Sequence, residues 1–262
     1  MDFRNGGVVM GAAAGPDIIE DGLVICLDAA DPKSYNGSGT TWYDRSGNGN
    51  NGTLVNGPTY NTGSFGTIQF DGINDSVSAT SIDLSNTNKI TLDFFCKLNS
   101  YVETNGQIDG ILCEFTNNFN SYTDGFYIGI ADDSTASFND TYPISINIKG
   151  NTGYNIYGYD KTSVNDLQWH HWVCILDKSI TGTNPRESKF FIDSVEKEAT
   201  TITAYKSDNG NNFGNRPFFI GSRNNSSFFA NMYISNFKIY NRALTSQEIQ
   251  QNFTALRGRY GI

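Results

Sequence analysis

Residues Gly22–Tyr60 read GLVICLDAADPKSYNGSGTTWYDRSGNGNNGTLVNGPTY, and the architecture expected for the whole chain starts from them. The segment begins as a strand, with apolar side chains at every second position of Leu23–Leu27. It then becomes a long run of Gly, Asn, Ser and Asp, whose residues hydrogen-bond their own backbone and tolerate positive φ. A loop this long needs buried anchors, and we expect Trp42 and Tyr43 to be those anchors. The segment therefore predicts a β-strand followed by a compact loop.

Strand patterns recur at short intervals along the rest of the chain. The clearest is Lys89–Leu98, in which the apolar residues at even positions share one face, as in a half-buried strand. The predicted strands are 22–28, 66–70, 75–79, 89–98, 110–116, 125–131, 144–149, 154–159, 171–177, 188–193, 195–203, 216–221 and 232–240. A single sheet of this width would curl or split. We therefore expect an all-β fold, a two-sheet antiparallel jelly-roll sandwich.

One helix and one β-bulge are also predicted. Thr245 and Glu248 form a capping box at the start of a short C-terminal helix. An apolar stripe for docking this helix follows: Ile249, Phe253 and Leu256. The alternation of apolar residues slips within 232–240, which predicts a bulge near Ser235 and Asn236.

Three further motifs carry a resemblance to a known family. They are FDGIND (Phe70–Asp75), WHHW (Trp169–Trp172) and IYNRALTSQEI (Ile239–Ile249). Together with the opening segment, they resemble the laminin G-like branch of the concanavalin A-like lectin/glucanase superfamily, over about Gly22 to Phe253. The resemblance implies the same jelly-roll sandwich. In that family the WHH segment is structural, which implies that Trp169 and Trp172 fill the core or its rim.

Composition and charge limit the possible partners. The chain has 27 Asp and Glu against 18 Lys and Arg, a net charge of −9, which argues against nucleic acid. Apolar runs are too short for membrane insertion. The cysteines lie in apolar runs without metal-binding spacing, so we expect buried free thiols. They are Cys26, Cys96, Cys113 and Cys174.

The chain divides into an extended N-terminal arm, residues 1–21, and one β-sandwich domain, residues 22–262. The arm is rich in Gly and Ala and cannot bury enough surface to fold alone. It is nevertheless more apolar than a linker needs, because it includes Val8–Met10 and Ile18–Ile19. We expect it to order on a partner, and in a virus particle that partner would be another virion subunit.

A calcium site is predicted in the turn after Phe70. Asp71, Asn74 and Asp75 bring hard oxygen ligands together there, which calcium prefers. The resemblance implies calcium at this rim of the sandwich. However, family members often carry an acidic pair where this chain has Ser235 and Asn236. The alternative is a turn whose carboxylates are satisfied by its own backbone.

The sequence predicts no enzyme and no catalytic residues. Related glucanases carry a strand of alternating acids, whereas here Glu114 stands alone in CEFTNN. Glycoside hydrolysis requires two carboxylates. The adjacent histidines His170 and His171 point to opposite faces of a strand and cannot chelate one metal together.

The function expected is therefore a non-enzymatic structural or binding protein. The Gly-rich arm leading into GLVICLDAADPKSYNGSGTTWYD resembles proteins of tailed bacteriophages, which implies a virion component that decorates the capsid or associates with the tail or its fibres. The alternative is a cell-surface or secreted carbohydrate-binding adhesin module. Surface glycans are a further possible partner, since an aromatic ring can stack on a sugar. The candidates for stacking are Tyr154, Tyr157 and Tyr159.

Overall fold

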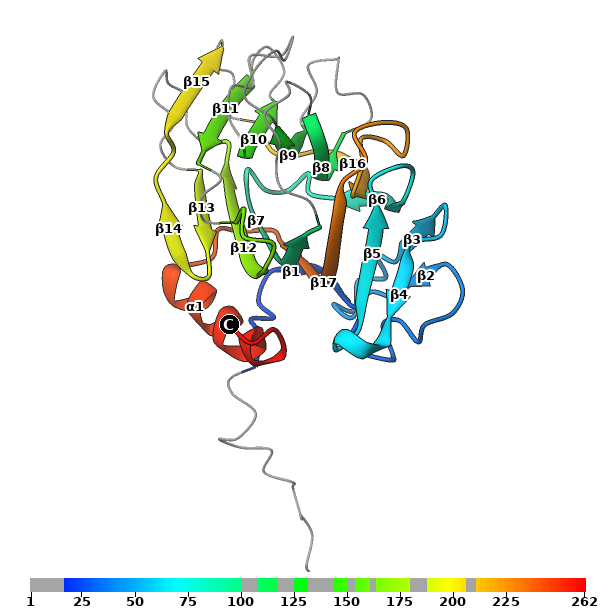
Figure 1. Cartoon of the computed structure of the whole chain (residues 1–262). Helices are drawn as coiled ribbons and strands as arrows, with labels where there is room; N and C mark the ends of the chain where they lie inside the picture. Colours follow the sequence, from blue (N-terminus) through cyan, green and yellow to red (C-terminus); the bar gives the residue numbers. More distant parts are fainter. Residues whose placement is uncertain are drawn as a thin grey trace, which may run out of the picture.

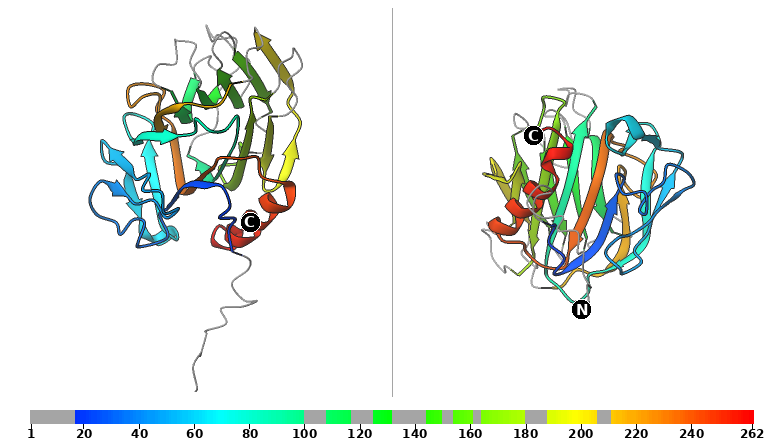
Figure 2. Two further views of the ribbon diagram at one scale, coloured as in Figure 1. Left: turned by 180° about the vertical axis from the view of Figure 1, so that it is seen from behind. Right: turned by 90° about the horizontal axis from the view of Figure 1, so that it is seen from below.

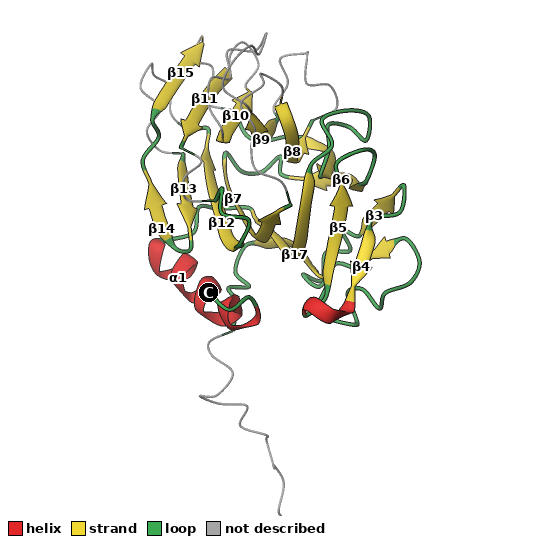
Figure 3. Ribbon diagram, viewed as in Figure 1, coloured by secondary structure: helices red, strands yellow, loops and turns green. Residues whose placement is uncertain are grey.

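The computed structural model describes residues 17–99, 108–116, 125–131, 144–149, 154–160, 164–179, 188–205 and 211–262. Within these ranges, 17 strands form two antiparallel sheets, and one α-helix lies near the C-terminus (Figures 1 and 3). The predicted two-sheet sandwich with a single short C-terminal helix is confirmed. No helix in the described ranges is long and apolar enough to span a membrane.

The first sheet has eight strands. They are β1 (Leu23–Asp28), β4 (Thr59–Asn61), β5 (Thr67–Asp71), β7 (Lys89–Leu98), β12 (Trp169–Asp177), β13 (Lys189–Ile192), β14 (Val195–Lys197) and β17 (Asn231–Tyr240). Their order is β14-β13-β12-β7-β17-β5-β4, and β1 also pairs with β17. The register of β17 against β7 shifts between Ile234 and Asn236, which confirms the predicted bulge.

The second sheet has nine strands. They are β2 (Thr41–Trp42), β3 (Gly52–Val55), β6 (Ser76–Asp83), β8 (Ile108–Phe115), β9 (Phe126–Ala131), β10 (Ile144–Lys149), β11 (Tyr154–Tyr159), β15 (Thr201–Tyr205) and β16 (Asn215–Ile220). Their order is β15-β11-β10-β9-β8-β16-β6-β3-β2. The strand predicted at 195–203 is wrong as one element, because β14 pairs with β13 in one sheet and β15 with β11 in the other.

The main apolar core lies between the two sheets. Strand β7 contributes its even positions to this core, as the alternation predicts: Ile90, Leu92, Phe94, Cys96 and Leu98. The expectation that β7 is only half-buried is wrong, since Thr91, Asp93 and Phe95 on its other face are also fully buried. Helix α1 (Ser246–Leu256) and the C-terminal residues pack over that face (Figure 2). All four cysteines are buried free thiols, as expected.

Local sequence signals predicted the C-terminal helix correctly. In α1, the Thr245 side chain accepts a hydrogen bond from the Glu248 N–H, and the Glu248 carboxylate accepts one from the Thr245 N–H, which is the capping box. The stripe of Ile249, Phe253 and Leu256 is buried. A short 3₁₀ turn, η2 (Arg257–Arg259), follows, and another, η1 (Thr62–Ser64), precedes β5.

The loop after β1 is held by polar contacts as well as by an aromatic anchor. Trp42 is fully buried, but Tyr43 is 54% exposed, so its predicted role as a second anchor is wrong. The Asp44 carboxylate replaces it, because Oδ1 accepts hydrogen bonds from the Cys26 N–H (2.8 Å) and from the Ser46 N–H (2.8 Å). This side chain ties the loop to β1.

Residues 17–21 of the predicted arm lie against the domain. Ile19 packs beside the cluster of Tyr240, Leu244 and Ile249. The remainder of the predicted arm, residues 1–16, lies outside the described residues.

Candidate functional site

The turn predicted to hold calcium joins β5 to β6 at one rim of the sandwich. Asp71 Oδ1 accepts hydrogen bonds from the backbone N–H groups of Ile73 (2.7 Å), Asn74 (3.2 Å) and Asp75 (3.5 Å). Asp75 Oδ2 accepts one from the Asp71 N–H at 3.2 Å. Burial would raise the pKa of Asp71, but these backbone donors outweigh it and lower the pKa. The turn thus brings the predicted residues together and also satisfies two of their carboxylate oxygens internally.

Calcium binding at Asp71, Asn74 and Asp75 stays a prediction. No group of three or more His, Cys, Asp or Glu side chains with metal-binding geometry occurs within the described ranges. Binding to the native state alone raises the melting temperature by mass action, so millimolar calcium should raise it and EDTA should reverse the rise. Asp71→Asn should abolish the shift, whereas Asp83→Asn, on the exposed end of β6, should not. Identical melting curves with EDTA and with calcium would reject the site.

The two histidines take part in separate contacts, as predicted. His170 contacts the carboxylates of Asp166 (Nε2–Oδ1 3.0 Å) and Asp193 (Nδ1–Oδ2 2.7 Å) at the end of β12. His171 lies under α1, with its Nε2 2.9 Å from Asp93 Oδ1. They do not face a common ligand. The two tryptophans of the motif also match the expectation, since Trp172 lies in the core and Trp169 packs at its rim beside Tyr260.

Two of the three tyrosines proposed as sugar-stacking rings are buried. Tyr157 and Tyr159 both belong to the main core, with exposures of 0% and 2%. Strand β11 therefore turns these rings inward, and their predicted binding role is wrong. The side chain of Tyr154 lies outside the described part of the structure.

A different cluster lies on the outer face of the nine-stranded sheet, the face turned away from the core. Phe115 and Cys113 point into the core, so Glu114 between them points outward. By the same alternation Tyr127 on β9 and Asn147 on β10 point outward. The registers pair Glu114 with Tyr127 and Tyr127 with Asn147, so the three side chains form a row across neighbouring strands.

The loop 221–230 packs over this row. The Arg223 guanidinium lies over the rings of Tyr127 (5.3 Å) and Phe228 (4.6 Å), within cation–π distance. Its Nε is 3.6 Å from Glu114 Oε1, and the Asn224 N–H donates to Glu114 Oε2 at 3.0 Å. We name this cluster the Glu114 site, formed by Glu114, Tyr127, Lys149, Arg223, Asn224 and Phe228.

Backbone contacts hold the loop in place, and two of its residues have a left-handed backbone conformation. The Ile111 N–H donates to the Phe228 carbonyl at 2.9 Å, which seats the loop on β8. Gly110 permits this approach, because a Cβ there would lie 2.6 Å from the Ala230 Cα. Asn224 and Phe228 adopt left-handed φ values of 49° and 51°, and for a bulky residue such as Phe228 this is strained. Strain of this kind is concentrated at ligand-binding and active sites.

The Glu114 site carries unusual electrostatics. Glu114 is fully buried, and burial raises the pKa of its carboxyl to about 7, although Arg223, the Asn224 N–H and Lys149 each lower it. Burial and the charge of Arg223 lower the pKa of Lys149 to about 8. Among the described residues, Glu114 Oε1 accepts no hydrogen bond. The site therefore combines two basic groups, a carboxyl that titrates near neutral pH and two aromatic rings.

Sequence reasoning missed the Glu114 site. The signal available was a single acid inside the apolar run ILCEF, on a strand with alternating buried positions. Its partners Arg223 and Asn224 lie about 110 residues further along the chain, in a segment without a recognisable motif. The alternation in this strand could have shown which face Glu114 lies on, but not which residues contact its carboxylate.

The sequence of most of the domain matches a family model. The model of the concanavalin A-like lectin/glucanases superfamily matches residues 71–250. No curated protein matches the chain by sequence.

Solved structures with a similar fold include toxin binding domains. The binding domain of botulinum neurotoxin DC in complex with rat synaptotagmin II has a TM-score of 0.61 and 15% identity, covering 91% of this chain and 52% of that one. The binding domain of Paraclostridial Mosquitocidal Protein 1 has a TM-score of 0.59 and 17% identity, with 89% and 52% covered. The neurotoxin DC domain in complex with SialylT has a TM-score of 0.59 and 12% identity, covering 90% of this chain and 52% of that one. The chain spans about half the length of these domains, and the likeness shows a common fold.

Proposed function

This chain belongs to the concanavalin A-like lectin/glucanases superfamily, and from that premise we propose that it is a non-enzymatic glycan-binding protein whose ligand contacts the Glu114 site. The observation that carries the proposal is the loop 221–230, in which Asn224 is exposed and Arg223 and Phe228 are partly exposed above a buried carboxyl. Amide, guanidinium and aromatic groups supply the hydrogen bonds and the apolar face that sugars need.

The structural neighbours support a binding role without defining the ligand. All three are described as binding domains, one with rat synaptotagmin II and one with SialylT. On this fold, ligand recognition is therefore a known use. The identity of the ligand of this chain has to come from its own loop and from experiment.

The experiment that tests the proposal is a glycan array probed with the full chain, followed by titration of the glycans that bind. Asn224→Gly removes the exposed carboxamide but keeps the left-handed backbone, so affinity should fall roughly tenfold, about 1.4 kcal/mol. Ser194→Gly, at another left-handed position in the β13–β14 turn, is the matched control and should bind normally. Equal loss in both variants, or no glycan bound, would reject the proposal.

The proposal includes the absence of hydrolysis. Glycoside cleavage requires a second carboxylate about 5–9.5 Å from the first. Within the described residues, the Glu114 carboxylate contacts the Arg223 guanidinium and the Asn224 N–H, and neither can act as the second carboxylate. Incubation with a panel of β-glucans should release no reducing sugar. Hydrolysis that disappears in Glu114→Gln would show that the protein is an enzyme.

We further propose that the protein is a component of a bacteriophage virion and that its domain faces outward from the particle. The support is the resemblance of the Gly-rich N-terminal region and of the segment from Gly22 onward to tailed-phage proteins. The adhesin alternative uses the same binding site on a cell surface or in secreted form. Mass spectrometry of purified particles distinguishes the two, because a virion component is present at fixed stoichiometry.

A further inference from the structure

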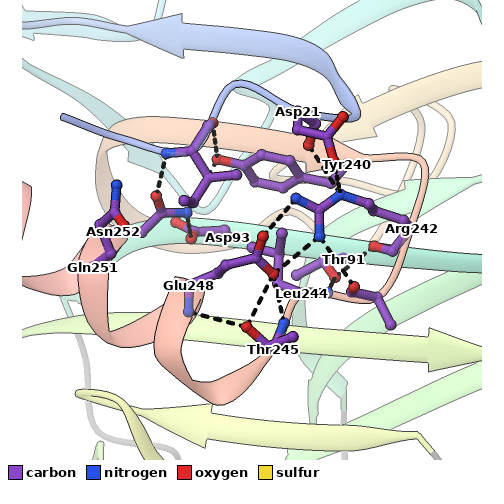
Figure 4. A network of polar contacts seen from close by, with 12 residues as sticks. Asp21, Thr91, Asp93, Tyr240, Arg242, Leu244, Thr245, Glu248, Gln251 and Asn252 are labelled. Carbon is purple, nitrogen blue, oxygen red and sulfur yellow. Dashed lines mark hydrogen bonds and ion pairs between the residues drawn. The ribbon is translucent and has the colours of Figure 1, made fainter.

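Residues 17–21, which we call the strap, lie across the outer face of the eight-stranded sheet beside α1. Ile18 packs beside the cluster of Phe95, Phe253, Leu256 and Tyr260, and Ile19 packs beside the neighbouring cluster of Tyr240, Leu244 and Ile249. These apolar contacts hold the strap between α1 and β17. The polar contacts shown in Figure 4 determine its position along α1.

Both backbone groups of Ile19 are bound by buried side chains. The Ile19 N–H donates to Asn252 Oδ1 at 2.8 Å, and the Tyr240 hydroxyl donates to the Ile19 carbonyl at 3.0 Å. Asn252 Nδ2 donates in turn to Asp93 Oδ2 (2.7 Å) and to the Tyr240 oxygen (3.0 Å). Asp93 therefore fixes which end of the Asn252 carboxamide faces the strap.

Two further side chains bind the strap at its ends. Gln251 Nε2 donates to the Asp17 carbonyl at 2.8 Å, and Arg242 Nε donates to the Asp21 carbonyl at 3.1 Å. The Arg242 Nε also contacts Asp21 Oδ2 at 2.8 Å. The carbonyl groups of residues 17, 19 and 21 thus each accept a hydrogen bond from a side chain of the domain. We call Asn252, Tyr240, Gln251 and Arg242 the clamp.

The connection between strap and sandwich is a single tight turn. The turn is closed by a hydrogen bond from the Leu23 N–H to the Glu20 carbonyl at 3.0 Å, and the Gly22 carbonyl accepts another from the Asn241 N–H at 2.8 Å. Gly22, at φ +77°, supplies the left-handed conformation that the turn requires. Straightening this turn releases one backbone hydrogen bond and moves the strap away from its own clamp.

We propose that the clamp is a binding site for an extended peptide, and that a second copy of this chain can fill it by exchanging residues 17–21. Exchange of an identical element is a low-cost route to association, because every strap contact reforms between copies. The inference goes beyond the proposed function, and it is independent of glycan binding at the Glu114 site. It gives the arm a defined receptor on its neighbour.

The test uses two full-length variants with complementary lesions. Ile19→Pro removes the N–H that Asn252 accepts and leaves the clamp intact. Asn252→Ala removes the clamp side chain that accepts the Ile19 N–H and leaves the strap intact. Each variant alone should be monomeric by native mass spectrometry. An equimolar mixture should form a species of twice the chain mass, with the strap of the Asn252→Ala chain in the clamp of the Ile19→Pro chain.

Matched controls separate exchange from general association. Ile19→Val keeps the N–H, so that chain fills its own clamp and should not pair with Asn252→Ala. Tyr240→Phe also weakens the clamp, because it removes the hydroxyl that donates to the Ile19 carbonyl and keeps the shape of the side chain. It replaces Asn252→Ala if that variant does not give a wild-type far-ultraviolet CD spectrum. A mixture of folded variants that stays monomeric would overturn the proposal. Glycan binding by the same chains, measured in parallel, is expected to be unaffected.

Discussion

Replacing Asp93 by alanine should lower the free energy of unfolding by about 3–5 kcal/mol, as expected when one partner of a buried ion pair is removed. Asp93 Oδ1 lies 2.9 Å from Lys238 Nζ, and all of these side-chain atoms are inaccessible to solvent. Burial opposes the charge on Asp93, but Lys238 and His171 outweigh it and hold the pKa of the carboxyl well below its usual range. The variant leaves the Lys238 ammonium buried without its counter-ion, and removes one of the hydrogen bonds of the Asn252 carboxamide.

A double variant that removes both charges tests whether the loss comes from leaving one buried charge unpaired. Asp93→Asn with Lys238→Met removes both charges at similar volume, and should recover much of the stability lost in Asp93→Ala. Chemical denaturation of the wild type, of Asp93→Ala and of the double variant measures this recovery. A loss below about 1 kcal/mol in Asp93→Ala would contradict the account, because that is the size expected of an exposed ion pair.

The second large effect is a pH dependence that Glu114 imposes on stability. The pKa of its carboxyl rises from an ordinary 4.5 to about 7 in the folded protein. Between these values the folded state binds more protons than the unfolded state, so stability decreases as pH rises. At 1.36 kcal/mol per pKa unit, the decrease amounts to about 3 kcal/mol. Glu114→Gln should remove this component.

The measurement is chemical denaturation at pH 4.5 and at pH 8, for the wild type and for Glu114→Gln. The wild type should lose about 3 kcal/mol more than the variant between these pH values. Glu196→Gln, an exposed acid that pairs with Lys189, is the control and should follow the wild type. Parallel profiles for Glu114→Gln and the wild type would mean that the Glu114 carboxyl is already ionised at pH 4.5.

Features set by neighbouring residues could be predicted from the sequence. The alternation in β7 identified its core face, and the slip in β17 identified the bulge at Ser235. The capping box of Thr245 and Glu248 located the start of α1. Each of these signals lies within a few residues, where local geometry alone determines the structure.

Features that depend on distant contacts could not be predicted. Strands β2, β3 and β4 have two to four residues each, too short for a period to appear. The buried face of β7 depends on α1, which covers Asp93 from more than 150 residues away. The Glu114 site likewise requires a loop that the register of β8 and β16 brings to it. Tertiary context sets these parts of the structure.

The most direct test of the proposed function is hydrogen–deuterium exchange of the full chain with and without a glycan that binds on the array. The account predicts slower exchange in the loop 221–230 and in strand β8, where the Ile111 N–H bonds to the Phe228 carbonyl. Exchange in α1 and in the Asp71–Asp75 turn should not change. Protection confined to that turn, with the loop 221–230 unaffected, would contradict the assignment of the binding face.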